Sequence, residues 1–276
     1  MSENFLLSAA RVALAFIRRD FLTDASYRLS MVIQFIQVIL TAAIAYYLAQ
    51  FLRQQGLQAV TSFARDYFAF VILGIAFYDF LVTAHGGFSQ TLFEGQITGT
   101  LETQLVTQTR LEMIMLGSSL YALLSTAVRF FAYLLVGVVL FGMPLAQANW
   151  GATLILLFLS VAAFSGFGLI SACFIVLFKK GDPFSWIFLG ASGVVGGVFY
   201  PVSALPSALA TLGHLLPITY ALEGLRRALL AGEGLAELWR ETLVLLLFAG
   251  VGLPLALMLF RWSVHRAKLT GTLAQY

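Results

Sequence analysis

The chain has 276 residues, of which 60% are hydrophobic and 11% are charged. Soluble domains carry about 25% charged residues, so this composition excludes a soluble globular protein and predicts an all-α integral membrane protein. The formal net charge of +3 does not call for a nucleic-acid partner, because basic residues at the membrane edges account for it.

Six apolar stretches are each interpreted as a membrane-spanning helix, since about 20 residues of helix cross about 30 Å of hydrocarbon. They lie at residues 29–52, 67–84, 113–140, 153–178, 184–198 and 243–260. A single domain over residues 1–276 follows. Its parts are an interface helix (1–28), spans one and two (29–84), a cytoplasmic coupling loop (85–112), spans three to five (113–198), an outer re-entrant hairpin (199–240), and span six with a tail (241–276).

The segment before the first span, residues 2–22, has the pattern of an amphipathic helix. Its apolar residues share one face: Leu6, Ala10, Ala13, Ile17 and Phe21. We expect this helix to lie along the membrane surface. The alternative is an ordinary cytoplasmic lead-in to the first span.

The positions of lysine and arginine predict the orientation of the chain in the membrane. More of these residues fall on the side of the N-terminus than on the opposite side, and an even number of spans returns the chain to its starting side. Both termini are therefore expected in the cytoplasm, together with the loop between spans two and three.

That loop contains a polar segment, residues 90–112. Leu101, Leu105 and Val106 recur in it at helical spacing, which predicts a short amphipathic helix in water. The segment holds Arg110 and three glutamates: Glu94, Glu102 and Glu112. Because a turn between adjacent spans needs only a few residues, a loop of this length suggests a function, and we hypothesise that another protein contacts it.

Polar side chains follow one face of two predicted spans. In span one they are Ser30, Gln34, Gln37 and Thr41, and in span three Ser118, Tyr121, Ser125 and Arg129. Two such stripes predict an internal, partly wet surface, and we assign Gln34, Gln37 and Thr41 to a substrate pathway. Hydrogen bonding between helices of a packed bundle explains the uncharged positions equally well.

Asp79 and Arg129 are charged residues within predicted spans. Each costs about 2.5 to 3.5 kcal/mol at mid-membrane on insertion scales, so both should face protein or water. We assign both to the same pathway, with a structural ion pair as the alternative. The sequence leaves open whether the two side chains reach each other.

Residues 201–240 are apolar but are interrupted by prolines and glycines. They predict two short helices, residues 207–216 and 220–230, broken at Pro217. Glu223 lies toward the start of the second helix and Arg226 toward its end, as the helix dipole favours. Neither helix is long enough to span, so we expect a re-entrant hairpin in the outer leaflet that other parts of the protein cover.

Motifs of soluble enzymes are absent from the sequence. It has no Gly-x-x-x-x-Gly-Lys-Ser/Thr phosphate loop, no His-Glu-x-x-His motif and no cluster of cysteine and histidine. We therefore expect no catalytic residue, no metal site and no unaided ATP hydrolysis in this chain.

Taken together, these segments resemble an ATP-binding-cassette (ABC) type-2 export permease. In the loop the resemblance is carried by Phe93-Glu94-Gly95 and by Gly99-Thr100-Leu101-Glu102. In the hairpin it is carried by residues 197–206 and by residues 216–232, with Leu216-Pro217, Glu223 and Arg226. Gln108 departs from the pattern, because such loops often have proline after the threonine.

The resemblance implies a half-transporter in the cytoplasmic (inner) membrane. Two such permeases, expected to be a homodimer, would bind two copies of a separate ATPase subunit, which would hold ATP and magnesium. The residues it assigns to ATPase coupling are Glu94, Gly95, Gly99, Thr100, Leu101, Glu102 and Arg110. Those it assigns to an outer gate are Pro201, Pro206, Pro217, Glu223 and Arg226.

The expected substrate is an amphipathic drug-like or lipid-like molecule. A polysaccharide or lipid-linked glycan is the first alternative, because aromatic side chains stack on sugars as well as on drugs. An ion-coupled secondary transporter is the second alternative. It would need a coupling-ion site, for which Asp79 and Arg129 are the candidates.

Overall fold

The computed structural model describes the backbone of residues 2–54, 67–97, 111–178 and 182–269, with most of their side chains. Within these ranges the chain is helical and contains no β-strand, which confirms the all-α prediction. The α-helices are α1 (Ser2–Ser26), α2 (Arg28–Gln54), α4 (Tyr67–Ile97), α6 (Leu111–Phe141), α7 (Trp150–Phe178), α8 (Pro183–Val195), α9 (Ser207–Leu215), α10 (Pro217–Arg226), α11 (Trp239–Leu247) and α12 (Leu253–Leu269). A 3-10 turn, η1 (Val202–Ala204), and two π turns, η2 (Arg227–Ala231) and η3 (Phe248–Gly252), complete the described elements.

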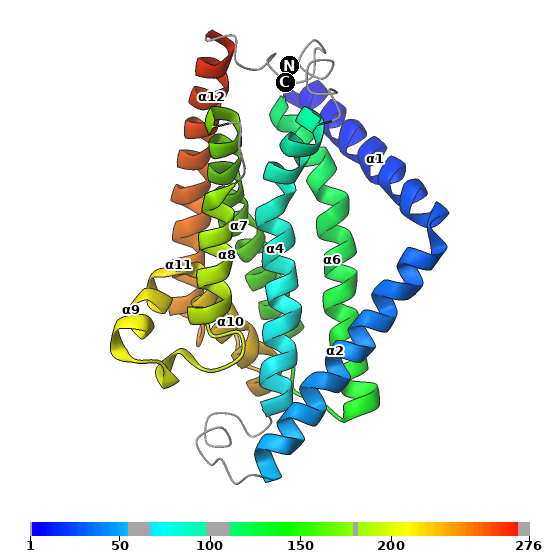
Figure 1. Ribbon diagram of the computed structural model, residues 1–276, viewed down its shortest axis with the longest axis vertical. Helices are drawn as coiled ribbons and strands as arrows, with labels where there is room; N and C mark the ends of the chain where they lie inside the picture. Colours follow the sequence, from blue (N-terminus) through cyan, green and yellow to red (C-terminus); the bar gives the residue numbers. More distant parts are fainter. Residues whose placement is uncertain (1, 55–66, 98–110, 179–181, 270–276) are drawn as a thin grey trace.

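Among the described residues, five helical segments are long and apolar enough to cross a membrane. They are Leu29–Gln54, Tyr67–Gln90, Ser119–Phe141, Trp150–Leu177 and Trp239–Ala267. The predicted fifth span is α8, which has 13 residues and is therefore only about 20 Å long. It begins beside the end of α7 and runs part of the way along the bundle (Figure 1). The six-span layout is therefore not confirmed, because the described residues hold five helices of spanning length and the predicted fifth span is a short helix.

Local chemistry sets both ends of α8. Asp182 caps the helix by accepting a hydrogen bond from the Ser185 amide, and Pro183 is its first residue. The helix was expected to reach residue 198 but ends at Val195. Gly197 follows with a φ of 85°, a left-handed conformation that glycine adopts at helix ends without steric cost.

The second span extends beyond its predicted end at residue 84. Helix α4 continues to Ile97, and α6 begins at Leu111, so the predicted loop of residues 85–112 is too long. The apolar run stops near residue 84, but packing continues because Gly87 lies against Ser119 of α6. Glu94 and Gly95 therefore lie on the last turns of α4. The other predicted coupling residues lie outside the described residues: Gly99, Thr100, Leu101, Glu102 and Arg110.

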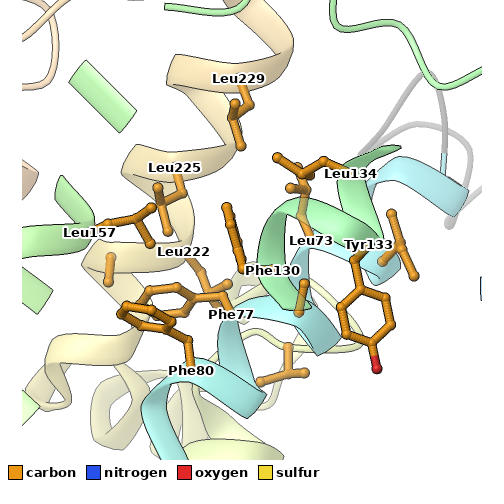
Figure 2. Packing of buried hydrophobic residues seen from close by; sticks show 14 of the residues in the cluster. Leu73, Phe77, Phe80, Phe130, Tyr133, Leu134, Leu157, Leu222, Leu225 and Leu229 are labelled. Carbon is orange, nitrogen blue, oxygen red and sulfur yellow. The ribbon is translucent and has the colours of Figure 1, made fainter. Parts of the chain in front are cut away.

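Helix α4 lies at the centre of the bundle, between α6 and α7 (Figure 1). Its buried side chains pack with those of α6, α7 and α10 in the main apolar cluster, part of which is shown in Figure 2. Members of that cluster include Leu73, Phe77, Phe80, Phe130, Leu157, Leu222, Leu225 and Leu229. A helix that is apolar on all sides is expected in such a buried position. Helix α4 thus connects the two ends of the bundle through its core.

The N-terminal amphipathic helix is present as α1 and runs to Ser26. It packs against α6, where Phe16 lies beside Gly117 and the Tyr121 hydroxyl donates a 2.7 Å hydrogen bond to Asp24. From there α2 runs obliquely to the other end of the bundle (Figure 1). Its predicted location on the membrane surface stays a prediction.

The hairpin consists of two short helices, as predicted. The break falls at Leu216, which has extended backbone (φ −94°, ψ 135°), and α10 starts at Pro217. It begins three residues before the predicted start at residue 220, because proline suits the first helical position. We call the end of the bundle that holds this hairpin the hairpin end, and the opposite end, where α4 ends and α6 begins, the loop end. Helix α1 begins and α12 ends at the loop end (Figure 1).

Candidate functional site in a polar groove and a cavity at the hairpin end

The five residues predicted to line a pathway lie around one hollow of about 230 Å³. Gln34, Gln37 and Thr41 reach it from α2, Asp79 from α4 and Arg129 from α6. The structure therefore brings the polar stripe of span one together with the two charged residues of spans two and three.

A second hollow of about 330 Å³ adjoins the first and shares Gln34, Val82 and Arg129 with it. It continues toward the loop end, where Asp24 of α1 and Tyr121 of α6 line it. We call the two hollows together the polar groove. Both predicted polar stripes contribute to its walls.

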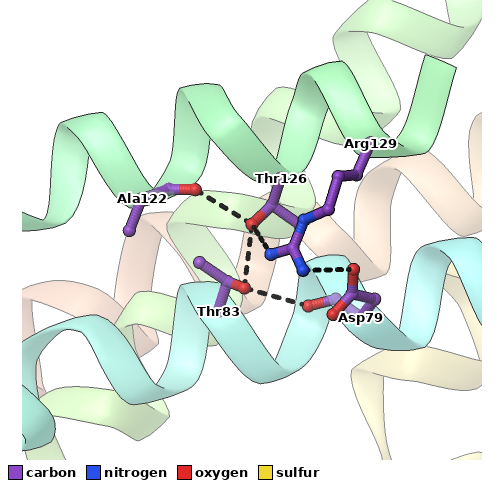
Figure 3. A network of polar contacts seen from close by, with 5 residues as sticks. All are labelled: Asp79, Thr83, Ala122, Thr126 and Arg129. Carbon is purple, nitrogen blue, oxygen red and sulfur yellow. Dashed lines mark hydrogen bonds and ion pairs between the residues drawn. The ribbon is translucent and has the colours of Figure 1, made fainter. Parts of the chain in front are cut away.

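Asp79 and Arg129 contact each other in this groove. Arg129 Nη1 lies 3.5 Å from Asp79 Oδ2, and the two side chains are 30% and 32% exposed respectively. Arg129 Nη2 donates a 3.0 Å hydrogen bond to the Thr126 hydroxyl (Figure 3). The Thr126 and Thr83 hydroxyls lie 3.0 Å apart, and Thr83 donates to the Asp79 carbonyl. This network joins α4 to α6 and leaves the two charged groups partly accessible.

A larger cavity of about 780 Å³ lies at the hairpin end, beside the first turns of α4 and the connection from α6 to α7. Three of the predicted outer-gate residues line it: Pro201, Glu223 and Arg226. The other two do not. Pro206 lies exposed before α9, and Pro217 is buried at the start of α10.

Arg226 fixes the position of the hairpin. Its guanidinium donates hydrogen bonds to the carbonyls of Gly197 and Phe70 at 2.9 Å and of Val198 at 3.1 Å. It also lies over the Phe70 ring, 3.4 Å from the ring centroid. Burial lowers the pKa of Arg226 to about 9 and Glu223 opposes that shift, so the group stays charged at neutral pH. One side chain thereby ties the hairpin to the end of α8 and the start of α4.

A second arginine, Arg227, joins the hairpin to the last span. It contacts Glu241 of α11 at 2.7 Å and Glu233 at 2.5 Å, and the Glu241 side chain is only 5% exposed. We did not predict this site. The available signal was the carboxylate of Glu241 beside an apolar run, since such a charge requires a buried partner.

Residues 11–230 match the sequence model of the family described as ABC-2 type transporter. The chain belongs to this family. It is 27% identical over 162 residues to the inner membrane transport permease YadH of Escherichia coli strain K12, covering 58% of this chain and 62% of YadH. It is 30% identical over 178 residues to nodulation protein J of Sinorhizobium fredii strain NBRC 101917 / NGR234, covering 61% and 64% respectively. The chain thus matches less than two thirds of the length of either relative.

The ABC-2 match extends from α1 to the hairpin and includes the polar groove and nearly all of the lining of the cavity at the hairpin end. All the residues predicted for coupling, pathway and gate fall inside it. Together with the five long apolar helices, it identifies the chain as a multi-pass membrane protein of the ABC-2 family.

This ABC-2 family chain also has a buried polar cluster near the loop end that we did not predict. His85 Nε2 of α4 lies 2.6 Å from the Ser185 hydroxyl of α8 and 3.0 Å from the Ser171 hydroxyl of α7. The two serine hydroxyls are 2.8 Å apart, and the Asp182 carboxylate accepts from Ser185. The cluster joins the start of α8 to α4 and α7. In the described part of the chain, no group of three or more His, Cys, Asp or Glu side chains is arranged to hold a metal ion.

Proposed function

We propose that this chain is the permease subunit of an ATP-driven exporter in the inner membrane. The observation that carries the proposal is the ABC-2 family match over residues 11–230, which covers all of the bundle except the last span. The relative YadH is an inner membrane transport permease, which supports the same class of protein and the same membrane.

In this proposal ATP and magnesium bind to two copies of a separate ATPase subunit. The ATPase contacts the end of α4 and the segment that follows it, through Glu94, Gly95, Gly99, Thr100, Leu101, Glu102 and Arg110. Because α4 is continuous from Tyr67 to Ile97, a displacement of that segment moves the helix that carries Asp79. A second copy of this chain completes the membrane part, with the termini of both copies in the cytoplasm.

The proposed substrate is a drug-like or lipid-like amphiphile. Its polar part would follow the polar groove, past Gln34, Gln37, Thr41, Asp79 and Arg129. The hairpin, held by Arg226 beside the cavity at the hairpin end, would act as the exit gate. Support for this path comes from the position of the groove between helices that carry the only polar stripes predicted from the sequence.

Affinity purification of the chain in mild detergent from its native host tests the partner. We expect a soluble ATPase to copurify at a constant ratio, and ATP to be required for transport by the purified complex in vesicles. Purification of the chain alone, with transport that persists in vesicles without ATP, would contradict the exporter proposal and favour a secondary transporter.

Substitutions in the coupling segment test the contact with the ATPase. Replacing Leu101 or Glu102 with alanine is expected to lower ATP-driven transport about tenfold, while folding and uncoupled ATP hydrolysis persist, because a tenfold change needs only about 1.4 kcal/mol of lost coupling. Glu237→Gln on the exposed connection before α11 is the matched control and should transport normally. Full coupling in both loop variants would show that the segment does not transmit the signal.

A further inference from the structure

Among the side chains that the structure describes, the charged ones that line the polar groove are two carboxylates, Asp24 and Asp79, and one guanidinium, Arg129. The described lining therefore carries a net negative charge. We propose that it binds the cationic headgroup of an amphiphile, with the positive centre against Asp79. This inference rests on the proposed function in naming a substrate class, but the binding it describes requires no ATPase.

Arg129 does not neutralise Asp79 completely. Their closest contact is 3.5 Å, whereas strong bonds between a cationic N–H and a carboxylate measure about 2.7 to 2.9 Å. The Asp79 side chain is also 32% exposed, so one face of its carboxylate is open to the groove. A ligand cation can approach this carboxylate without first breaking a close ion pair.

The two charged side chains are almost equally exposed, but two of the three guanidinium nitrogens are not available to a ligand. Arg129 Nη2 already donates to Thr126, and the Nε atom is buried without a hydrogen-bond partner in the described part of the chain. A buried Nε cannot be reached by a ligand in the groove. The groove thus offers a negative group more readily than a positive one, which favours a cation over an anion.

Tyrosines strengthen this preference. Tyr78 and Tyr133 line the same hollow as Asp79, and Tyr121 lines the second hollow beside Asp24. The hydroxyls of Tyr78 and Tyr121 are engaged as donors, to the Leu189 carbonyl and to Asp24 respectively. Aromatic rings attract quaternary ammonium and similar cations, which are weakly hydrated and accept such contacts in place of water.

The size of the groove suits a compact cation or the headgroup of a longer amphiphile. Its two hollows measure about 230 and 330 Å³, each close to the lower limit of sites that enclose a drug-sized ligand, about 300 Å³. The α2 wall has exposed apolar residues on its outer side, including Ile33, Ile36 and Leu40. An apolar tail can therefore lie along α2 while the headgroup occupies the groove.

Two probes of the same shape and opposite charge test the proposal: tetraphenylphosphonium and tetraphenylborate. Their binding to the full chain in lipid nanodiscs is measured without ATP by equilibrium dialysis, with empty nanodiscs subtracted. We expect saturable binding of tetraphenylphosphonium that Asp79→Asn weakens about tenfold and Arg129→Gln strengthens. Glu237→Gln, which removes an equal charge outside the groove, should bind as the unmodified chain does.

Asp24→Asn is the second variant, in case Asp79→Asn does not fold, and it should weaken phosphonium binding in the same direction. Folding of each variant is checked by size-exclusion chromatography. Unchanged phosphonium binding in folded carboxylate variants would overturn the proposal, and so would tighter binding of tetraphenylborate that is lost in Arg129→Gln. Because ATP is absent, these outcomes are independent of whether an ATPase copurifies.

Discussion

Replacing Arg226 with glutamine is expected to lower the free energy of unfolding by about 3 kcal/mol or more, which is a large share of the total stability of a domain. Glutamine cannot reach the three carbonyls that the guanidinium binds, on Gly197, Val198 and Phe70. Buried carbonyls that lose a charged donor each keep a desolvation penalty of about 1 to 3 kcal/mol. The yield of monodisperse protein and its thermal midpoint in detergent should both fall sharply.

Two further variants show whether the loss of stability in Arg226→Gln comes from the lost hydrogen-bond geometry or from the lost charge. Arg226→Lys keeps the positive charge but presents a single ammonium, so it should restore only part of the stability. Arg240→Gln removes an exposed arginine of α11 and should leave the midpoint unchanged. If Arg226→Gln unfolds at the same temperature as Arg240→Gln, the guanidinium does not hold the hairpin in place.

Replacing Gly168 with alanine is the second change with a large expected effect. A Cβ atom on this residue of α7 would overlap the backbone carbonyl of His85 in α4, and backbone cannot rotate away as a side chain can. Helices α4 and α7 would have to separate, which would also disturb the hydrogen bond between His85 and Ser171. Overpacking of this kind costs about 1 to 3 kcal/mol, and we expect the upper part of that range.

Gly190→Ala is the matched control for this substitution. Gly190 lies in α8 with no atom within 4 Å of the position that a Cβ would take. Alanine should therefore be neutral there, or stabilising by up to about 1 kcal/mol through its higher helix propensity. Thermal unfolding of both variants in the same detergent decides the matter, since equal midpoints would mean that α4 and α7 are not in close contact at Gly168.

The apolar runs predicted where the long helices lie but not where each one ends. The predicted end of this span at residue 84 is followed directly by His85, Gly86 and Gly87, which interrupt the apolar run. The helix continues because Gly87 packs on α6 and Phe88 is buried in a second apolar cluster with α7 and α12. Hydropathy records where the chain meets lipid, whereas helix ends depend on backbone hydrogen bonds and on neighbouring helices.

The groove was partly predictable because its residues follow one helix face. The spacing of Gln34, Gln37 and Thr41 placed them on the same side of α2, and they do line one hollow. Whether they face the same hollow as Asp79 and Arg129 depends on how α2, α4 and α6 are rotated against one another. Periodicity within one helix does not specify that rotation. The substrate pathway itself stays a prediction.

The sites that we missed are built from partners far apart in the chain. His85 lies 86 residues from Ser171 and 100 from Ser185, and none of the three belongs to a polar stripe that was noticed. Arg227 and Glu241 belong to different helices, and the turn between them sets their contact. Such pairs become visible only when the helices are packed, because the sequence does not show which partner a polar side chain will meet.

The π turn at Phe248–Gly252 accommodates one additional residue within the last span. In a regular α-helix one residue more or less would rotate everything after it by about 100°, whereas a π turn takes up the extra residue in one wider turn. Deleting Gly250, which has open space around it, should therefore restore a regular helix and leave its second half close to its present orientation. Ala256 and Phe260 should then stay in the cluster that they form with α7, whereas a deletion in the regular part of α12 before them would turn them away from it.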